Sequence, residues 1–233
     1  MQTNQPQNNR GLRFFNEVVY ELMPAYYNAM DWLTFGAWWR LVRVALEYVP
    51  SAGKVLEIAF GPGRLHAELA QRTDFCAGLD LAWGMCRFTK QRLQRAHLPT
   101  KIVQGSVFNF PYPNNCFDTI VSTFAFSGFP NGQEALHEIA RITAVNGQII
   151  FVDIALPQDG NRLGTSLAKL WQKMGDYLYD VPQMMQAEGL AVTTFKEFGP
   201  GKHIRVIVGQ KETAVSPSKI NQGDAENAEK KRK

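Results

Sequence analysis

The sequence predicts an α/β fold in which a seven-stranded, mostly parallel sheet carries helices on both faces and follows an N-terminal helical cap. From Lys54 onward, short runs rich in valine, isoleucine and phenylalanine alternate with helical patterns, which is typical of parallel strands joined by helices. The last two of these runs are separated only by residues 199–202. Because so short a link cannot make a parallel crossover, we expect the last strand to be antiparallel.

The strand-like runs, in chain order, lie at residues 54–59, 75–80, 101–105, 117–123, 147–155, 192–198 and 203–210. The helical patterns between them cover residues 63–72, 83–96, 131–143 and 161–188, and the last pattern is broken near Pro182. The strand runs are short and almost continuously apolar, as expected of strands that are buried on both faces of a sheet.

The flanking regions differ in composition from this α/β region. Residues 1–10 are rich in glutamine and asparagine, and residues 212–233 are polar and basic, so we expect both segments to be disordered. Residues 11–50 have a helical pattern with many aromatic side chains and should form a cap of two or three helices. Residues 51–211 then form the ligand-binding domain.

Composition limits the classes of function. The chain has 233 residues, of which 45% are hydrophobic and 20% charged, as in a soluble globular protein. Its net charge of +4 and isoelectric point near 9.0 are mild, so we expect no nucleic-acid partner. No apolar run reaches the roughly 18 residues of a membrane span, and the first residues do not resemble a signal peptide. The three cysteines are widely spaced, which favours buried thiols in a reducing compartment. We expect a cytoplasmic protein, with peripheral membrane contact left open and no obligate protein partner evident.

The turn after the first strand is the strongest functional signal. Residues 55–65 (VLEIAFGPGRL) run from an apolar strand through Gly61 and Gly63 into a helix, whose free N–H groups point at the turn. Ligands of open α/β sheets bind at such strand ends. A dinucleotide site would need a third glycine, but His66 stands there. Glu57 would repel a pyrophosphate and suits a cofactor that carries an ammonium and a sulfonium.

Several motifs resemble those of the class I S-adenosylmethionine-dependent methyltransferases. Residues 55–63 (VLEIAFGPG) are similar to the first motif of that family, and residues 78–85 (GLDLAWGM) to its second-strand motif. Residues 102–107, 110–121 and 138–148 resemble later strands and turns of its type 11 branch, in the expected order. The resemblance covers about residues 50–156. It implies a Rossmann-like sheet of order 3-2-1-4-5-7-6 and S-adenosyl-L-methionine as the cofactor.

The resemblance also implies roles at the first two strand ends. Gly61 and Gly63, with Ala59 before them, would let the backbone approach the methionine part of the cofactor. Glu57 would face its amino group, directly or through water, unless it pairs within the core. Asp80 would accept hydrogen bonds from both ribose hydroxyls, each contributing about 1.5–3 kcal/mol.

Residues that follow the next strands would surround the rest of the cofactor. Those expected near the adenine are Leu81, Met85, Ser106 and Val107, of which Leu81 and Met85 have packing as an alternative role. Thr123 or Phe124, at the end of the fourth strand, would lie near the sulfonium. The family usually has aspartate in place of Ser106 and glycine in place of Ala59. A non-catalytic cofactor-binding module therefore stays an alternative, and a nicotinamide-dependent oxidoreductase is a further one.

The acceptor of the methyl group is less well defined by the sequence. Residues 26–40, including Tyr27 and Arg40, are similar to the N-terminal segment of ubiquinone and menaquinone biosynthesis C-methyltransferases and related phospholipid N-methyltransferases. Residues 122–129 form an apolar lip that includes Phe126, where DNA base-amino methyltransferases have a different motif. We therefore expect a small apolar or amphipathic acceptor, quinone- or lipid-like, methylated by in-line displacement. Tyr27, Arg40 and Phe126 are the expected acceptor contacts, with helix packing as the alternative role of Tyr27 and Arg40.

No catalytic base is fixed by a motif. The candidates are His203, in the last hairpin, and Asp153, at the end of the fifth strand. The four histidines show no metal-ligand spacing, so we expect no metal.

Overall fold

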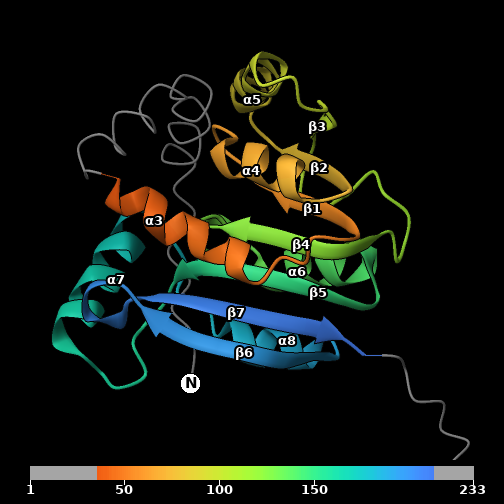
Figure 1. The fold of residues 1–233 in the computed structure, drawn as a ribbon. Helices are drawn as coiled ribbons and strands as arrows, with labels where there is room; N and C mark the ends of the chain where they lie inside the picture. The colour runs from red at the N-terminus through yellow and green to blue at the C-terminus, as the bar shows by residue number, and fades with distance from the viewer. Residues whose placement is uncertain (1–35, 213–233) are drawn as a thin grey trace, which may run out of the picture.

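One sheet of seven strands organises the computed structural model, which describes residues 36–212 (Figure 1). The strands are β1 (Lys54–Ile58), β2 (Phe75–Asp80), β3 (Ile102–Gln104), β4 (Phe117–Thr123), β5 (Thr143–Ile154), β6 (Leu190–Phe198) and β7 (Ile204–Lys211). Their order is β3-β2-β1-β4-β5-β7-β6. The neighbours from β3 to β5 are parallel, and β7 is antiparallel to both β5 and β6. The predicted fold and strand order are confirmed.

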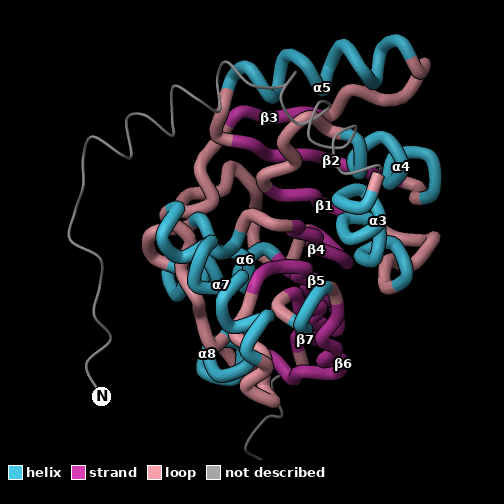
Figure 2. Tube along the Cα trace, turned by 90° about the vertical axis from the view of Figure 1, so that its left-hand side faces the viewer, coloured by secondary structure: helices cyan, strands magenta, loops and turns pink. Residues whose placement is uncertain are grey.

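Helices cover both faces of the sheet. They are α3 (Ala37–Arg43), α4 (Arg64–Arg72), α5 (Trp83–Arg95), α6 (Gly132–Ile142), α7 (Arg162–Met174) and α8 (Val181–Ala187), with short 3-10 turns η1 (Val44–Glu47), η2 (Phe126–Gly128) and η3 (Pro200–Lys202). Figure 2 shows α3 and α4 on one face, α6 and α8 on the other, and α7 across the edge where β4 and β5 end. Within residues 36–212, no helix has the length and apolar character needed to cross a bilayer.

The core lies on both sides of the sheet, because alternate residues of each strand point to opposite faces. Leu56 and Ile120 belong to the cluster beneath α6 and α8, whereas Val55 and Val121 belong to the cluster beneath α4 and η1. All four side chains are fully buried. Since both faces are covered in this way, the strand ends are where the sheet is open to a ligand.

Two elements differ from the sequence prediction by more than two residues at a boundary. The fifth strand begins at Thr143 rather than at residue 147, because Phe117 of β4 already pairs with Thr143 before a shift in register. The helical pattern over residues 161–188 is divided into two helices, as the predicted break near Pro182 indicated. The first ends at Met174, where Gly175 adopts a φ of 118°, and the second begins at Val181 with Asp180 as its N-cap. Pro182 therefore marks the start of α8 rather than the end of α7.

The predicted segments at the two ends fall largely outside the described residues. Residues 1–10, the first part of the expected cap and residues 213–233 belong to this group. Of the cap, α3 and η1 are described. Trp39 from α3 and Ala45 from η1 pack in the cluster on that face of the sheet.

Close contact between two glycines sets the position of α7, and this predicts the effect of a small substitution. A Cβ on Gly164 would overlap the carbonyl oxygen of Gly201 in η3. We expect Gly164→Ala to lower the free energy of unfolding by roughly 1–3 kcal/mol, as overpacking does. Ser166→Ala on the exposed side of the same helix should stay within about 0.5 kcal/mol of the wild type. Urea unfolding measures both, and equal stability of the two variants would contradict this packing.

Candidate functional site

The turn between β1 and α4 forms the first part of the candidate site. Its backbone is left-handed at Ala59 (φ 50°), Gly61 (φ 53°) and Gly63 (φ 67°). Glycine adopts this conformation freely, whereas an alanine there costs about 1–2 kcal/mol. The Ala59 N–H donates to the Leu79 carbonyl at 2.7 Å, which holds the residue in place. The hydrogen bond to β2 therefore holds Ala59 in a left-handed conformation that an alanine would otherwise avoid.

Asp80 joins this turn to the end of β2. Its Oδ2 accepts from the Gly61 N–H at 2.9 Å, and its Oδ1 accepts from the Ala82 N–H at 2.9 Å. The residue is only 8% exposed. The carboxylate is thus fixed beside Gly61 at the carboxyl edge of the sheet, between the first two strand ends.

The two glycines of the turn have different surroundings. A Cβ on Gly61 would have no atom of residues 36–212 within 4 Å, whereas a Cβ on Gly63 would overlap the side chain of Thr89 in α5. The Thr89 hydroxyl in turn donates to the Gly61 carbonyl at 3.1 Å. Gly61 therefore leaves open space over the backbone, and Gly63 allows α5 to pack. Open space beside a fixed carboxylate fits the ribose and methionine parts of S-adenosylmethionine.

Glu57 lies beneath this turn with its side chain toward α4. It is 1% exposed, and its Oε2 lies 3.1 Å from Nδ1 of His66. Burial raises the pKa of the Glu57 carboxyl, and the hydrogen bond to His66 opposes that effect. Of the two roles expected for Glu57, pairing within the core is the one seen here. Its contact with a cofactor amino group stays a prediction.

The residues expected near the adenine divide into exposed and buried ones. Leu81 is 63% exposed, directly after Asp80. Ser106 is half-buried, and its hydroxyl accepts from the Phe108 N–H at 3.2 Å. Met85 and Val107 lie in core clusters. The apolar surface at this edge therefore comes from Leu81, while Met85 has the packing role that was its alternative.

Aromatic side chains from three distant segments meet where β4 ends. Phe124 directly follows Thr123, has a φ of 50°, and donates its N–H to the Val152 carbonyl at 2.7 Å. Its ring centroid lies 4.3 Å from that of Trp38 in α3. Trp38 lies 6.0 Å from Trp171 in α7. The structure thus brings α3 of the N-terminal cap and α7 to the apolar lip at residues 122–129.

Phe126 is another residue that the sequence predicts to contact the acceptor. Phe126 is 1% exposed and stacks on Phe151 in the core at 4.5 Å, so its predicted place at the lip is corrected. Tyr27 lies outside the described residues.

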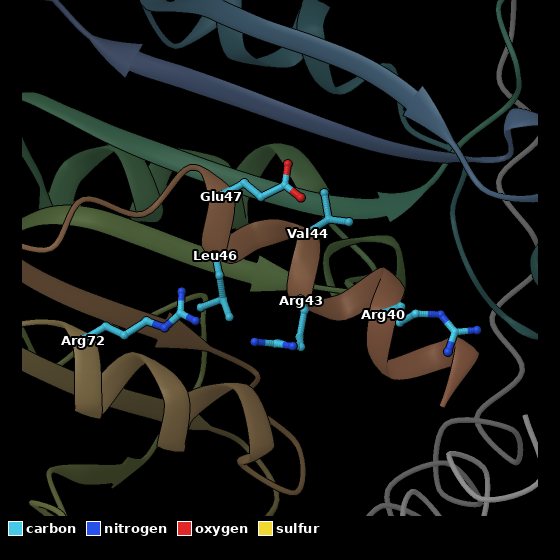
Figure 3. Close-up of a pocket in the computed structure, with 6 residues that line it drawn as sticks. All are labelled: Arg40, Arg43, Val44, Leu46, Glu47 and Arg72. Atoms are coloured by element: carbon cyan, nitrogen blue, oxygen red, sulfur yellow. The ribbon is translucent and has the colours of Figure 1, made fainter. Parts of the chain in front are cut away.

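Arg40 is exposed on α3, beside a pocket of about 320 Å³. The lining residues are Arg40, Arg43, Val44, Leu46, Glu47 and Arg72 (Figure 3). Figure 3 shows the Arg40 side chain pointing away from Arg72. Neither Asp80 nor Phe124 lines this pocket, so it is separate from the strand-end site.

Asp153 forms a hydrogen-bonded unit with Ser127 and Asp176. The Ser127 N–H donates to Asp153 Oδ2 at 2.9 Å. The Ser127 hydroxyl lies 2.8 Å from Asp153 Oδ1 and 2.9 Å from Asp176 Oδ1. One hydroxyl proton cannot serve two ionised carboxylates at once, so this arrangement favours a proton on one of the acids. Burial raises the pKa of Asp153 to about 6, with a smaller contribution from Asp176 in the same direction. Burial also raises the pKa of Asp176.

Of the two candidate bases, Asp153 is the one beside the aromatic lip, because the residue before it in β5 pairs with Phe124. His203 is 7% exposed, and its Nδ1 lies 2.6 Å from the Pro200 carbonyl oxygen. That hydrogen bond holds the ring against η3.

Sequence reasoning missed Trp171, Asp176 and the role of Ser127. The last lies within the predicted lip, but only the fold places it between two acids. Trp38 belongs to the aromatic cap segment, but nothing in the sequence distinguishes it from the other aromatic residues of that segment as a site residue.

Comparison with known proteins agrees with this geometry. Residues 56–151 match the family model described as "Methyltransferase domain". A demethylmenaquinone methyltransferase of Thermus thermophilus is 28% identical over 146 residues, which are 60% of this chain and 66% of the relative. A 2-phytyl-1,4-naphtoquinone methyltransferase of Nostoc punctiforme is 24% identical, over 61% of this chain and 65% of the relative. The structure of a SAM-dependent methyltransferase from Thermotoga maritima has a TM-score of 0.66 at 18% identity, covering 83% of this chain and 98% of that one.

The sheet order and these matches define a class I fold that uses S-adenosyl-L-methionine. Residues 56–151 are a methyltransferase domain of the type 11 branch, as the motifs indicated. The chain spans less than two thirds of the length of these two curated relatives, at 66% and 65%.

The contrast between the two glycines gives a stability prediction. Gly61→Ala adds strain at a left-handed residue and should cost about 1–2 kcal/mol of unfolding free energy. Gly63→Ala adds the same strain and also displaces Thr89, so it should cost about 1–3 kcal/mol more. Denaturant unfolding of both variants measures the difference. Equal losses would show that α5 does not depend on Gly63.

The acid pair predicts a pH dependence of stability. Because the folded-state pKa of Asp153 is about 6, above its ordinary value of 3.8, the folded protein binds this proton more tightly. The free energy of unfolding should therefore fall, by about 1–3 kcal/mol, as pH rises from 4 to 6 through this window.

In Asp176→Asn, the amide can donate to the Ser127 oxygen, and the hydroxyl proton then serves Asp153. The decline of stability with pH should become smaller in this variant, whereas Asp74→Asn at an exposed site should leave it unchanged. Unfolding curves at several pH values test this, and an unchanged profile in Asp176→Asn would contradict the shared proton.

Proposed function

We propose that this chain transfers a methyl group from S-adenosylmethionine to a small apolar acceptor of the quinone class. The observation that carries the proposal is the arrangement at the carboxyl edge of the sheet. A fixed carboxylate, Asp80, lies beside the open turn at Gly61. An aromatic group of Trp38, Phe124 and Trp171 lies where β4 ends. The quinone acceptors of the two relatives support the choice of acceptor class.

On the cofactor side, the chain supplies a hydrogen-bond acceptor and an apolar surface. Bound S-adenosylmethionine supplies an activated methyl group on a sulfonium. Asp80 would accept from the ribose hydroxyls, and Leu81 offers an exposed apolar face to the adenine. Ser106 takes the place of the usual aspartate, so the adenine amino group would meet an acceptor without charge.

On the acceptor side, the aromatic group supplies flat apolar surfaces. Planar aromatic pairs gain about 0.5–1.5 kcal/mol beyond their buried area, so Trp38, Phe124 and Trp171 suit a quinone or naphthoquinone ring. Holding the acceptor in line with the methyl group is the main contribution that such a site can make. Alignment of two reactants supplies roughly 7–11 kcal/mol of the barrier.

An acceptor that is methylated at carbon must also lose a proton. Asp153, next to the lip, is the residue suited to receive it, because Ser127 holds its carboxyl in place and its pKa of about 6 is close to neutral pH. Its basic form should dominate above pH 6, so the rate of methyl transfer should rise with pH through this value.

Cofactor binding tests the proposal first. Removing the charge in Asp80→Asn should weaken S-adenosylmethionine binding about 10- to 150-fold, as expected for charge-assisted hydrogen bonds. Isothermal titration measures the affinity, circular dichroism verifies the fold, and Asp74→Asn is the exposed control. Wild-type protein that binds neither S-adenosylmethionine nor its demethylated product, but binds NADH, would contradict the proposal in favour of an oxidoreductase.

A non-catalytic cofactor-binding module is the second candidate, favoured by Ser106 in place of the usual acid. Methyl transfer from isotope-labelled cofactor to reduced naphthoquinones and benzoquinones separates the two. Tight cofactor binding without labelled product across that panel would support the module.

A further inference from the structure

Helix α7 exposes an apolar stripe that no other described element covers. Leu163, Leu170 and Met174 are 57%, 54% and 55% exposed, and half-buried Leu167 lies between them in sequence. The spacing of these four residues places them along one side of the helix. The residues that α7 buries are instead Gly164 and Ala168. The larger aliphatic side chains of this helix thus face outward.

Cations flank this stripe. Arg162, Lys169 and Lys173 are exposed, and α7 contains no acidic residue. Among the described residues, none of these three cations forms an ion pair, whereas the nearby Asp159 is paired with Lys202 at 2.8 Å. Asp176, which follows the helix, is bound to Ser127. The outward side of α7 is therefore apolar and positively charged.

We infer that α7 is an interfacial helix that docks the protein on an anionic lipid bilayer. Helices that lie in the membrane interface combine an apolar side with lysine and arginine beside it. The leucines and Met174 would enter the boundary between headgroups and acyl chains, and the cations would contact the anionic headgroups. This mode of binding does not require a membrane-spanning helix.

The charge pattern favours a lipid surface over a second copy of the chain. In a symmetric dimer the same patch meets itself, so Arg162, Lys169 and Lys173 would face the cations of the partner copy. Like charges in such an interface are unfavourable. An anionic headgroup layer instead offers opposite charge on both sides of the stripe.

The position of α7 gives this docking a consequence for the candidate site. Trp171 lies on the same helix and extends the aromatic group of Trp38 and Phe124. Figures 1 and 2 show α7 at the edge where β4 and β5 end. A bilayer that binds α7 would therefore lie next to the aromatic lip. The docking goes beyond methyl transfer, and its test needs neither cofactor nor acceptor, so the two proposals can fail separately.

Vesicle co-sedimentation of the full chain tests the docking. We expect binding to phosphatidylcholine vesicles that contain phosphatidylglycerol, and much weaker binding to phosphatidylcholine alone. Leu170→Ser should reduce binding about tenfold, whereas Val145→Ser, an exposed apolar residue at the other end of β5, should leave it unchanged. Lys169→Glu with Lys173→Glu should reduce binding at least about tenfold. The matched double variant on α5, Lys90→Glu with Arg95→Glu, makes the same change in net charge and should retain most of the binding.

Three results would overturn the proposal. The first is no binding of the wild type to either kind of vesicle. The second is equal loss in the α5 and α7 charge variants, or no effect of Leu170→Ser, since both indicate adsorption by net charge. The third is a change of oligomeric state or a large loss of thermal stability in Leu170→Ser without vesicle binding, which would assign the stripe to a second copy or to the chain itself.

Discussion

The carboxylate of Asp80 and its two backbone donors are the interaction on which the candidate site depends. Helices cover both faces of the sheet, so the strand ends are the part of its backbone that is best placed to meet a ligand. At that edge, Asp80 accepts from the N–H groups of Gly61 and Ala82, and this fixes the turn after β1 against the end of β2. Three further features of the site lie next to this carboxylate. They are the left-handed backbone of Ala59 and Gly61, the packing of Thr89 against Gly63 and the exposed side chain of Leu81.

Polar and aromatic halves of the edge have separate structural origins. The polar half belongs to the residues 56–151 that match the methyltransferase family. The aromatic half combines Phe124 at the end of β4 with Trp38 and Trp171, both from outside that range. This division would allow proteins with the same cofactor site to differ in their acceptor. The methyltransferase domain supplies the edge at which the cofactor would bind, whereas α3 and α7 supply the surface next to it. Helix α7 would further connect that surface to a lipid layer, since its inner side carries Trp171 and its outer side carries the leucine stripe.

How far the sequence predicts this structure depends on how local each signal is. Strand order, the turn at Gly61 and the position of Asp80 follow from residues close together in sequence or from ordered motifs, and the structure has them. The choice between Phe124 and Phe126 at the lip could not be made, because it depends on the left-handed φ of Phe124 and on the packing of Phe126 against Phe151. Glu57 has a buried partner in His66 that depends on how α4 packs on β1. Ser127 meets Asp153 and Asp176 only through contacts between η2, β5 and the segment after α7, and no spacing in the sequence encodes these.

A crystal structure of the chain with bound S-adenosylhomocysteine would show whether Asp80 holds the cofactor. We expect the ribose hydroxyls to lie within hydrogen-bond distance of the Asp80 carboxylate. We also expect the adenine next to Leu81, and the sulfur on the side of the turn that faces Phe124. A ligand bound elsewhere, such as in the pocket lined by Arg43 and Arg72, would contradict this expectation. So would a ligand at the edge that leaves Asp80 without contact to the ribose.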